Sequence, residues 1–384
     1  MKNFLHLIMA AFAVCALLPV SCIKDEAPNS ECDITKAYVH VADADEMFFS
    51  LSDTMINVVS TDSVISFNVR RNADISSLAP VFTLTEGATI SPANGSTHDF
   101  SQGPVVYTVT SQNKAWRRSY KVAFNHVTVT VSDTSRFDFE HYHLDATGHY
   151  YMWQRELSDG SLSNEWATAN AGFQLSMGTA LSDEYPTVPV ANGYDGSAVK
   201  LTTMSTGPFG AMVNKRMAAG NLYLGTFVLD SALSNPLKST FFGVPFDGRP
   251  VSFSGYYKYT PGKDFQDRTG KIHKELTDSA AVYAVFYRNH DAAGNAVTLY
   301  GDNIKTSPQI VAIADTKYLA PTDTWTPFEV NFDYSQTIDW QLLANRGYNL
   351  AVVFSASKYG DIFWGAIGST LYIDKVSVIS TKED

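Results

Sequence analysis

Aromatic residues gather in a stretch rich in turn-forming residues between positions 150 and 185. Trp153, Trp166 and Tyr185 are candidates for a flat platform, with Tyr151 beside them and Asn170 supplying an amide group. The axial C–H groups of a sugar pack on aromatic rings while polar side chains hydrogen-bond its hydroxyls. Binding residues also tend to lie on loops that a rigid scaffold carries. The pattern favours a carbohydrate-binding site, and the alternative is that these rings fill a core.

Carboxylates are needed for glycoside hydrolysis, in which one acts as an acid and the other as a nucleophile or base. From residue 135 onward the sequence contains no Glu-x-Asp or Glu-x-x-x-Glu pair of the kind found in sandwich-fold hydrolases. Glu329 and Asp333 are an even number of positions apart and would share one face of a strand. Hydrolysis is therefore an alternative function, since carboxylates that are distant in sequence can meet in space.

Other chemistries have weaker support. His141 and His143 would project from one face of a strand, as zinc ligands can. No third ligand is identifiable at a spacing typical of zinc sites, so a surface or hydrogen-bonded pair of histidines is favoured. Motifs that cradle nucleotide phosphates are absent, and no nucleotide cofactor is expected. The net charge of −11, with scattered Lys and Arg, disfavours nucleic acid as a partner.

The N-terminus has the features of an export signal. Lys2 precedes a mostly apolar run over residues 4–20, which is short for a membrane span. The run ends at Ser21 and Cys22 and is followed by Ile-Lys-Asp-Glu. Residues 18–22 resemble a relaxed bacterial lipobox, and Lys-Asp-Glu resembles the surface-export signal of Bacteroidetes lipoproteins.

This resemblance implies a signal peptide over residues 1–21 and lipid attachment at Cys22. Residues 22–43 would then form a tether that holds the protein on the outer membrane, exposed at the cell surface. An ordinary secretory peptide cleaved elsewhere is the alternative. Apart from the anchor, Cys32 would be the only cysteine of the mature chain, so neither a disulfide nor a cysteine metal site is expected.

Two all-β domains are expected to position these residues, because 384 residues suffice for two cores. Ile65, Phe67 and Val69 alternate with polar residues, and such alternation buries one face of a strand. We predict an immunoglobulin-like β-sandwich over residues 44–126 and a larger jelly-roll β-sandwich over residues 135–384. Strands of the second domain are expected near residues 198–203, 251–257, 281–287, 350–355 and 371–378, with a short helix over 340–345.

Both domains have family resemblances. The segment 78–92, followed by Asp99-Phe100 and residues 107–110, resembles small immunoglobulin-like domains at the front of Bacteroidetes surface lipoproteins, which implies a spacer. Further along stand Phe-Asp-Phe-Glu at 137–140, Gly-Val-Pro-Phe at 243–246 and Gly-Tyr-Tyr-Lys-Tyr at 255–259. In this order they resemble the putative carbohydrate metabolism domain (PCMD) family. The resemblance implies a β-sandwich linked to glycan handling, without deciding between enzyme and binder.

The two ends of the second domain resemble those of jelly-roll carbohydrate-binding modules, whose first and last strands pair and share a structural calcium ion. Glu140 in the opening motif and Asp374 in the closing Tyr-Ile-Asp are the implied carboxylate ligands. Lys375 stands where many modules have a second Asp, which removes one ligand and adds a positive charge. The alternative is that Glu140 and Asp374 form ordinary hydrogen bonds at strand ends.

These features predict a surface lipoprotein that binds a polysaccharide or oligosaccharide non-catalytically during glycan capture, alongside other glycan-utilisation proteins. A glycoside hydrolase would instead show two carboxyl groups facing each other in a cleft. An adhesin or fimbria-like structural subunit would show an exposed edge strand that accepts another chain.

Overall fold

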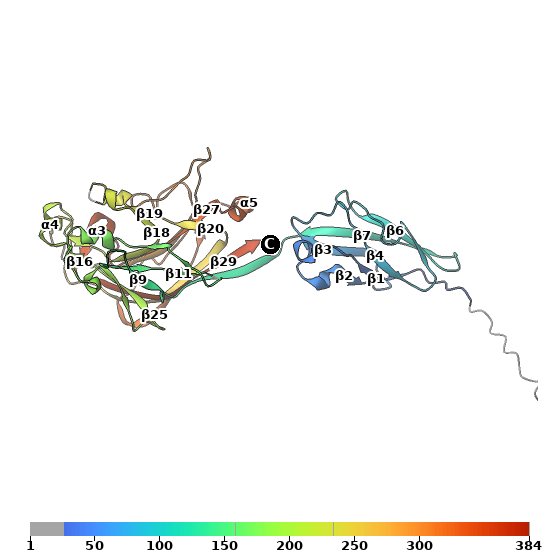
Figure 1. Cartoon of the computed structure of the whole chain (residues 1–384), viewed down its shortest axis with the longest axis horizontal. Coiled ribbons are helices and arrows are strands. Elements are labelled where there is room, and N and C mark those ends of the chain that lie inside the picture. Colours follow the sequence, from blue (N-terminus) through green and yellow to red (C-terminus); the bar gives the residue numbers. More distant parts are fainter. Residues whose placement is uncertain (1–26, 158, 233, 384) are drawn as a thin grey trace, which may run out of the picture. The chain divides into compact units, whose positions relative to one another are not determined.

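The computed structural model describes residues 27–157, 159–232 and 234–383, so Cys22 and the predicted signal peptide lie outside the described residues. The chain divides into two compact units, one up to Val129 and one over Thr130–Glu383 (Figure 1). In the described segments, no helix combines the length and the apolar character needed to cross a membrane. The predicted all-β class is confirmed, because strands dominate the regular structure and the helices are all short.

The first unit is a sandwich of a three-stranded and a four-stranded sheet around one core, which includes Phe67, Tyr107 and Tyr120. The first sheet has the order β2 (Met55–Asn57), β1 (Ile34–Tyr38), β4 (Val81–Leu84), and the second β3 (Val64–Arg70), β7 (Arg117–Val127), β6 (Val105–Thr110), β5 (Thr89–Ser91). The alternation predicted at Ile65, Phe67 and Val69 is confirmed, since all three are buried.

The predicted tether over 22–43 is too long. Residues 34–38 form strand β1, which pairs with β4, and Ile34, Ala37 and Val39 are buried in the first core. The second unit also begins earlier than residue 135, because strand β8 (Thr130–Phe137) pairs along its length with the final strand. In neither place does the strand show a regular apolar alternation, since β1 is short and irregular and β8 is mostly polar, so pairing with a neighbouring strand decided these boundaries.

The second unit consists of two packed sheets, which we call the β29 sheet and the β27 sheet after their long central strands. The β29 sheet has the order β14 (Thr187–Val190), β15 (Ala198–Thr202), β29 (Thr370–Glu383), β21 (Arg249–Thr260), β25 (Thr322–Asn331), and β8 pairs with β29. The β27 sheet has the order β13 (Trp166–Ala167), β18 (Asn221–Phe227), β27 (Tyr348–Ser355), β23 (Ala281–Arg288), β24 (Ile310–Asp315), β26 (Asp333–Tyr334). Two short strands extend it, since β19 (Thr240–Phe242) pairs with β18 and β20 (Val244–Phe246) pairs with β27.

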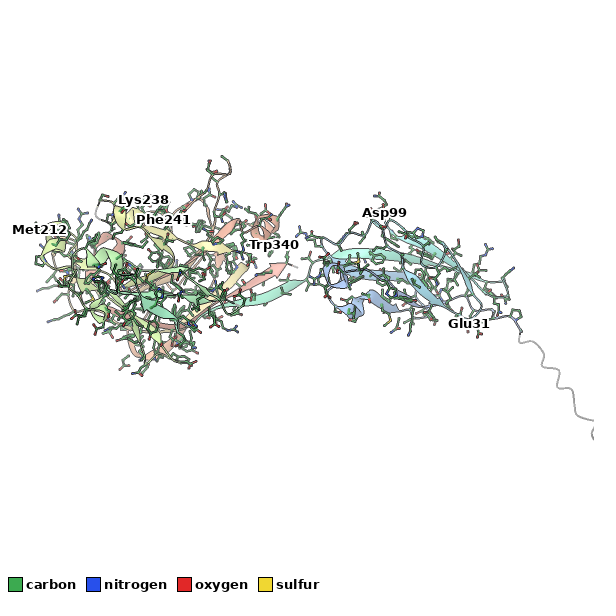
Figure 2. All side chains as sticks on the ribbon, viewed as in Figure 1. Glu31, Asp99, Met212, Lys238, Phe241 and Trp340 are labelled. Atoms are coloured by element: carbon green, nitrogen blue, oxygen red, sulfur yellow. The ribbon has the colours of Figure 1, made fainter. Side chains whose placement is uncertain are left out.

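Short elements connect and cover the two sheets. The two-stranded pairs are β9 (Tyr142–Leu144) with β10 (Tyr151–Trp153), β11 (Arg155–Glu156) with β12 (Leu162–Ser163), β16 (Met204–Ser205) with β17 (Met217–Ala218), and β22 (Phe265–Gln266) with β28 (Gly365–Ala366). The α-helices are α2 (Ala44–Met47) in the first unit and α3 (Asn170–Gln174), α4 (Gly207–Met212) and α5 (Trp340–Ala344) in the second. Met212 projects from α4 at the surface (Figure 2).

The β27 sheet is buried on both of its faces. Leu222, Val282 and Val352 point into the core shared with the β29 sheet. Their neighbours Tyr223 and Tyr283 point to the opposite, outer face, where loops between the strands cover them and form a second apolar cluster. Because successive side chains of a strand alternate between faces, this second layer requires apolar residues at consecutive positions. The outer layer leaves a cavity at one end.

Candidate functional site

A cavity of about 450 Å³ lies between the outer face of the β27 sheet and the loops that cover it. Strands β18, β23 and β27 supply its floor through Asn221, Tyr223, Tyr283 and Ser355. The loops at 206–219, 232–239, 301–306 and 357–363 supply its walls. Most of the lining is apolar, with few polar groups, which is the usual make-up of a ligand-binding pocket.

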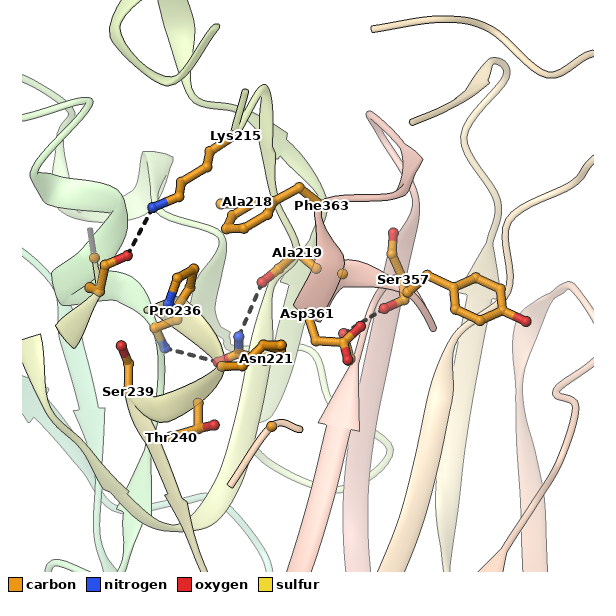
Figure 3. Close-up of a pocket in the computed structure, with 18 of the residues that line it drawn as sticks. Lys215, Ala218, Ala219, Asn221, Pro236, Ser239, Thr240, Ser357, Asp361 and Phe363 are labelled. Carbon is orange, nitrogen blue, oxygen red and sulfur yellow. Dashed lines mark hydrogen bonds between the residues drawn. The ribbon is translucent and has the colours of Figure 1, made fainter. Parts of the chain in front are cut away.

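Charged groups from two different loops enter this cavity (Figure 3). The Lys215 ammonium donates a hydrogen bond to the Ala232 carbonyl oxygen at 3.2 Å, and burial lowers the pKa of this lysine. Burial raises the pKa of the Asp361 carboxyl, which accepts one hydrogen bond from the Ile362 amide at 3.0 Å. The Asp361 carboxyl, which keeps access to solvent, and the Lys215 ammonium thus border a largely apolar cavity. Both groups are available to hydrogen-bond a polar group of a ligand there.

Ser239 contributes a hydroxyl without a partner. Its side chain is buried, and its Oγ atom forms no hydrogen bond with any described residue. Figure 3 places Ser239 on the wall of the cavity beside Thr240. Since buried hydroxyls almost always have a hydrogen-bond partner, an unpaired one on a cavity wall suggests that a ligand or water supplies it.

The loop that carries Asp361 is held by a buried carboxylate behind it. Asp278 Oδ2 accepts hydrogen bonds from the Ser357 hydroxyl, the Ser369 hydroxyl at 2.7 Å and the Ala366 amide at 2.8 Å. These donors span the segment 357–369, and Asp278 therefore fixes the position of the loop. Burial nevertheless raises the pKa of Asp278.

Phe363 belongs to the same loop and has an uncommon backbone conformation. Its φ angle is 61°, in the left-handed region that a bulky side chain rarely adopts. Its ring lines the cavity, with the Lys215 ammonium 5.8 Å from the ring centroid. Backbone strain of this kind persists only where the surroundings enforce it, and it is frequent at ligand-binding sites.

The described lining residues with carboxyl groups are Asp302 and Asp361. Asp302 is paired with the Lys238 ammonium at 2.8 Å, and the two side chains lie largely at the surface. A hydrolytic pair needs one protonated and one ionised carboxyl flanking the same bond. The raised pKa of Asp361 is a shift in the direction that a general acid needs. Asp302 is already engaged in an ion pair with Lys238, which makes it a poor second carboxyl for catalysis.

The predicted aromatic platform is wrong as a surface feature, because three of its rings are buried. Trp153 is 1% exposed, Trp166 4% and Tyr185 2%. Trp166 packs against Phe137 and Phe354 in the core between the sheets. Short strands position Trp153 and Trp166 in the interior, and Tyr185 follows a single 3-10 turn over Ser182–Glu184. Loop-like composition alone did not reveal that packing.

The other two predicted binding residues also have structural roles in this fold. Asn170 is buried and forms two hydrogen bonds with the backbone of Thr187. Its side-chain amide donates to the Thr187 carbonyl oxygen at 2.8 Å, and its side-chain oxygen accepts from the Thr187 amide at 3.2 Å. Tyr151 is half-buried and packs on the core. None of the five predicted residues lines the cavity.

Glu140 and Asp374, the predicted calcium ligands, bind the same loop through its backbone. Asp374 Oδ2 accepts hydrogen bonds from the amides of Tyr194 at 2.7 Å and Asp195 at 3.1 Å. Glu140 accepts from the Ser197 amide at 3.0 Å. Strands β8 and β29 do pair, as the resemblance implied.

The donor set does not fit a calcium ion. The carboxylate oxygens already accept amide hydrogens, and the Lys375 ammonium lies 3.0 Å from Asp195 Oδ2. Nowhere in the described part of the chain do three or more His, Cys, Asp or Glu side chains gather as a metal site requires. Calcium prefers six to eight oxygen ligands with no competing cation.

Chelation is therefore expected to leave the stability of the protein unchanged. An ion that binds only the folded state would raise the melting temperature, by an amount that grows with the logarithm of its concentration relative to Kd. We expect equal Tm values with excess EDTA and with millimolar calcium, measured by differential scanning fluorimetry. A Tm that falls in EDTA and recovers with calcium would contradict the poor fit at Glu140 and Asp374.

Comparison with known proteins places the second unit in a family. Residues 138–379 match the family model described as putative carbohydrate metabolism domain. The chain belongs to this PCMD family. Residues 47–124 match a second model, described as SGBP, N-terminal. The resemblance predicted from the motifs at 137–140, 243–246 and 255–259 is confirmed.

Two solved structures from Bacteroides are similar to this PCMD protein. A protein of Bacteroides thetaiotaomicron VPI-5482, described as a putative glycoside hydrolase, has 37% identity over 93% of this chain and 99% of its own, with a TM-score of 0.60. A protein of Bacteroides vulgatus ATCC 8482 with the same description has 36% identity over 65% of this chain and 98% of its own, with a TM-score of 0.60. None of the curated proteins compared with the chain matches it.

Sequence reasoning missed the residues of the cavity. Lys215, Ser239, Tyr283 and Asp361 come from four separate segments and belong to no recognised motif. One weak signal exists, since Lys-Tyr-Gly-Asp at 358–361 closely follows the strongly apolar segment 350–354, and binding residues are common in such loops.

Proposed function

We propose that the PCMD unit binds a carbohydrate in this cavity without catalysing a reaction, and that the protein does so at the cell surface. The observation that carries the proposal is the unpaired Ser239 hydroxyl in a largely apolar cavity that also contains Asp361 and Lys215. Sugars need this combination, because their C–H faces require apolar contact and their hydroxyls require a few directed partners.

The comparisons support a role with glycans. The second unit belongs to a carbohydrate-related family, and the first unit matches the SGBP N-terminal model. We infer that the first unit acts as a spacer and that lipid attachment at Cys22 holds the protein on the outer membrane. A surface position would bring the cavity to polymers that cannot enter the cell.

The test is a single-atom deletion at Ser239 with a matched control. The chain from residue 23 onward is screened against xylan, mannan, starch and pectin, and the strongest ligand is titrated by calorimetry. Ser239→Ala should weaken binding about two- to tenfold, the usual contribution of one hydrogen bond. Stability should be nearly unchanged, because the hydroxyl has no partner among the described residues.

Ser380→Ala is the control, since the Ser380 hydroxyl is also buried and unpaired but lies on β29, outside the cavity. It should leave both affinity and stability unchanged. Equal affinity of the wild type and both variants would show that the cavity does not contact the bound sugar.

Glycoside hydrolysis is the second candidate, favoured by the raised pKa of the Asp361 carboxyl at the cavity and by the names of the two Bacteroides relatives. A carboxyl whose pKa is raised by burial is the kind of group that acts as a general acid. Release of reducing ends from the bound polysaccharide, abolished in Asp361→Asn, would establish this function. Binding without release would support the non-catalytic role.

A further inference from the structure

The outer face of the β29 sheet carries a row of aromatic and lysine side chains across four adjacent strands. Lys258 on β21 is opposite Tyr372 on β29, and Tyr372 is opposite Lys200 on β15. Trp325 on β25 completes the row, with its ring centroid 6.5 Å from that of Tyr372. All four side chains are half-buried, while the strand neighbours of Lys200, Lys258 and Tyr372 point into the core. This face is opposite the β27 sheet and therefore separate from the cavity.

Tyr194 stands over this row from the loop 193–197. Its ring stacks on that of Tyr256, with centroids 3.7 Å apart and an interplanar angle of 10°, and it meets Trp325 edge to face at 6.4 Å. Tyr194 is 48% exposed despite these contacts. One face of its ring is thus covered by Tyr256, and the ring remains accessible from outside the sheet. We call Tyr194, Tyr256, Lys258, Trp325, Tyr372 and Lys200 the aromatic–lysine surface.

The loop that carries Tyr194 is held in place by Asp374 and Glu140. Asp374 accepts hydrogen bonds from the amides of Tyr194 and Asp195, and Glu140 from that of Ser197. Hydrogen bonds to charged acceptors are about twice as strong as neutral ones. The ring of Tyr194 is therefore positioned before any ligand arrives, and little conformational entropy is lost on binding.

The charge of this surface indicates what it binds. The Lys258 ammonium lies 4.8 Å from the centroid of the Trp325 ring and 5.9 Å from that of Tyr372. Among the described residues neither Lys258 nor Lys200 forms an ion pair, whereas nearby Lys375 is paired with Asp195. Lys258 and Lys200 therefore offer two ammonium groups to an anionic ligand, whereas the carboxylates of Asp374 and Glu140 are occupied by backbone amides of the Tyr194 loop.

We propose that the aromatic–lysine surface binds an extended glycan chain that carries carboxylate or sulfate groups. Sugar rings stack on Tyr194 and Trp325, and the acidic groups lie at Lys258 and Lys200. The surface is an open sheet face rather than an enclosed pocket, which suits a polymer that continues beyond the site in both directions. It is a second site, on the face opposite the cavity, and does not depend on the cavity binding a ligand.

The test uses the chain from residue 23 onward with three polymers: polygalacturonate, chondroitin sulfate and neutral dextran. We expect binding to at least one acidic polymer, weakening as NaCl is raised, and none to dextran. Tyr194→Ala should reduce affinity about tenfold through lost stacking. Lys258→Met, which keeps the apolar stem, should reduce affinity and flatten the salt dependence. The two acidic polymers distinguish carboxylate from sulfate recognition.

Tyr318→Ala is the matched control, since Tyr318 is an exposed tyrosine outside the aromatic–lysine surface, and it should bind as the wild type does. Circular dichroism confirms folding of each variant. No binding to either acidic polymer, or unchanged affinity in Tyr194→Ala and Lys258→Met, would overturn the proposal. Ser239→Ala should leave acidic-polymer binding intact, so failure of this site and failure of the cavity are separable.

Discussion

Replacing Trp166 by alanine is expected to lower the free energy of unfolding of the second unit by about 3–5 kcal/mol. The indole is 4% exposed and packs against Phe137 at 5.2 Å, Phe139 at 5.4 Å and Phe354 at 6.1 Å between ring centroids. Phe137 ends β8 of the β29 sheet and Phe354 belongs to β27, so the ring joins the two sheets. Removal leaves a cavity that this dense core cannot refill. Guanidinium denaturation followed by tryptophan fluorescence measures the loss.

Trp116→Ala is the control for Trp166→Ala. Trp116 is 62% exposed in the first unit, and its removal should change stability by less than about 0.5 kcal/mol. If Trp166→Ala kept its stability and lost only glycan binding, the ring would be acting as a binding platform after all. That result would contradict the burial of Trp166 in the core.

Replacing Asp278 by alanine is expected to cost about 3 kcal/mol of stability and to abolish ligand binding in the cavity. The carboxylate accepts hydrogen bonds from Ser357, Ala366 and Ser369, and all three donors would be left in a buried space. The loop that carries Asp361 and Phe363 would then lose its fixed position. Thermal unfolding and calorimetric titration of the same preparation measure both effects.

Asp278→Asn separates the hydrogen bonds from the charge. The amide oxygen keeps an acceptor toward the loop, so the loss of stability at pH 7 should be smaller than in the alanine variant. Retention of full stability and binding in Asp278→Ala would show that the loop is held by other contacts.

The pH dependence gives a further check on Asp278. Because burial raises its pKa above the unfolded value of 3.8, protonation favours the folded state. The stability contributed by this group is fully present below that unfolded pKa and is lost as pH rises through the folded pKa. Wild type should therefore gain stability relative to Asp278→Asn as pH falls from 7 toward about 4. An identical pH profile of the two proteins would contradict the raised pKa.

Much of the fold follows from local pattern. The five predicted strands of the second unit appear as β15, β21, β23, β27 and β29. Strands β21 and β29 largely alternate between buried and more exposed positions, whereas β23 and β27 are nearly continuous apolar runs, and both patterns are typical of strands. The helix predicted over 340–345 is present as α5, where Asp339 accepts a hydrogen bond from the Leu342 amide at the first turn. Tyr257 and Tyr259 face the core and Tyr256 does not, as alternation along a strand requires.

The candidate sites did not follow from local pattern. Trp153, Trp166 and Tyr185 lie in loop-rich sequence, yet short strands and neighbouring rings draw them into the interior. Trp325, by contrast, is half-buried on the outer face of the β29 sheet. The sequence around an aromatic residue looks the same whether its ring is buried in a core or exposed on a sheet face. Only the packing of other elements over its strand determines which of the two occurs.

By itself, the sequence determined the all-β class, the two-domain order, the family and the pairing of the first and last strands of the second unit. These depend on hydrophobic alternation and on motifs read along the chain. Only the tertiary structure decided which face of each sheet is covered and which loops meet. Lys215, Ser239 and Asp361 became neighbours because separate loops pack over the β27 sheet. Contacts of that kind depend on side-chain packing across the whole domain, which no local pattern records.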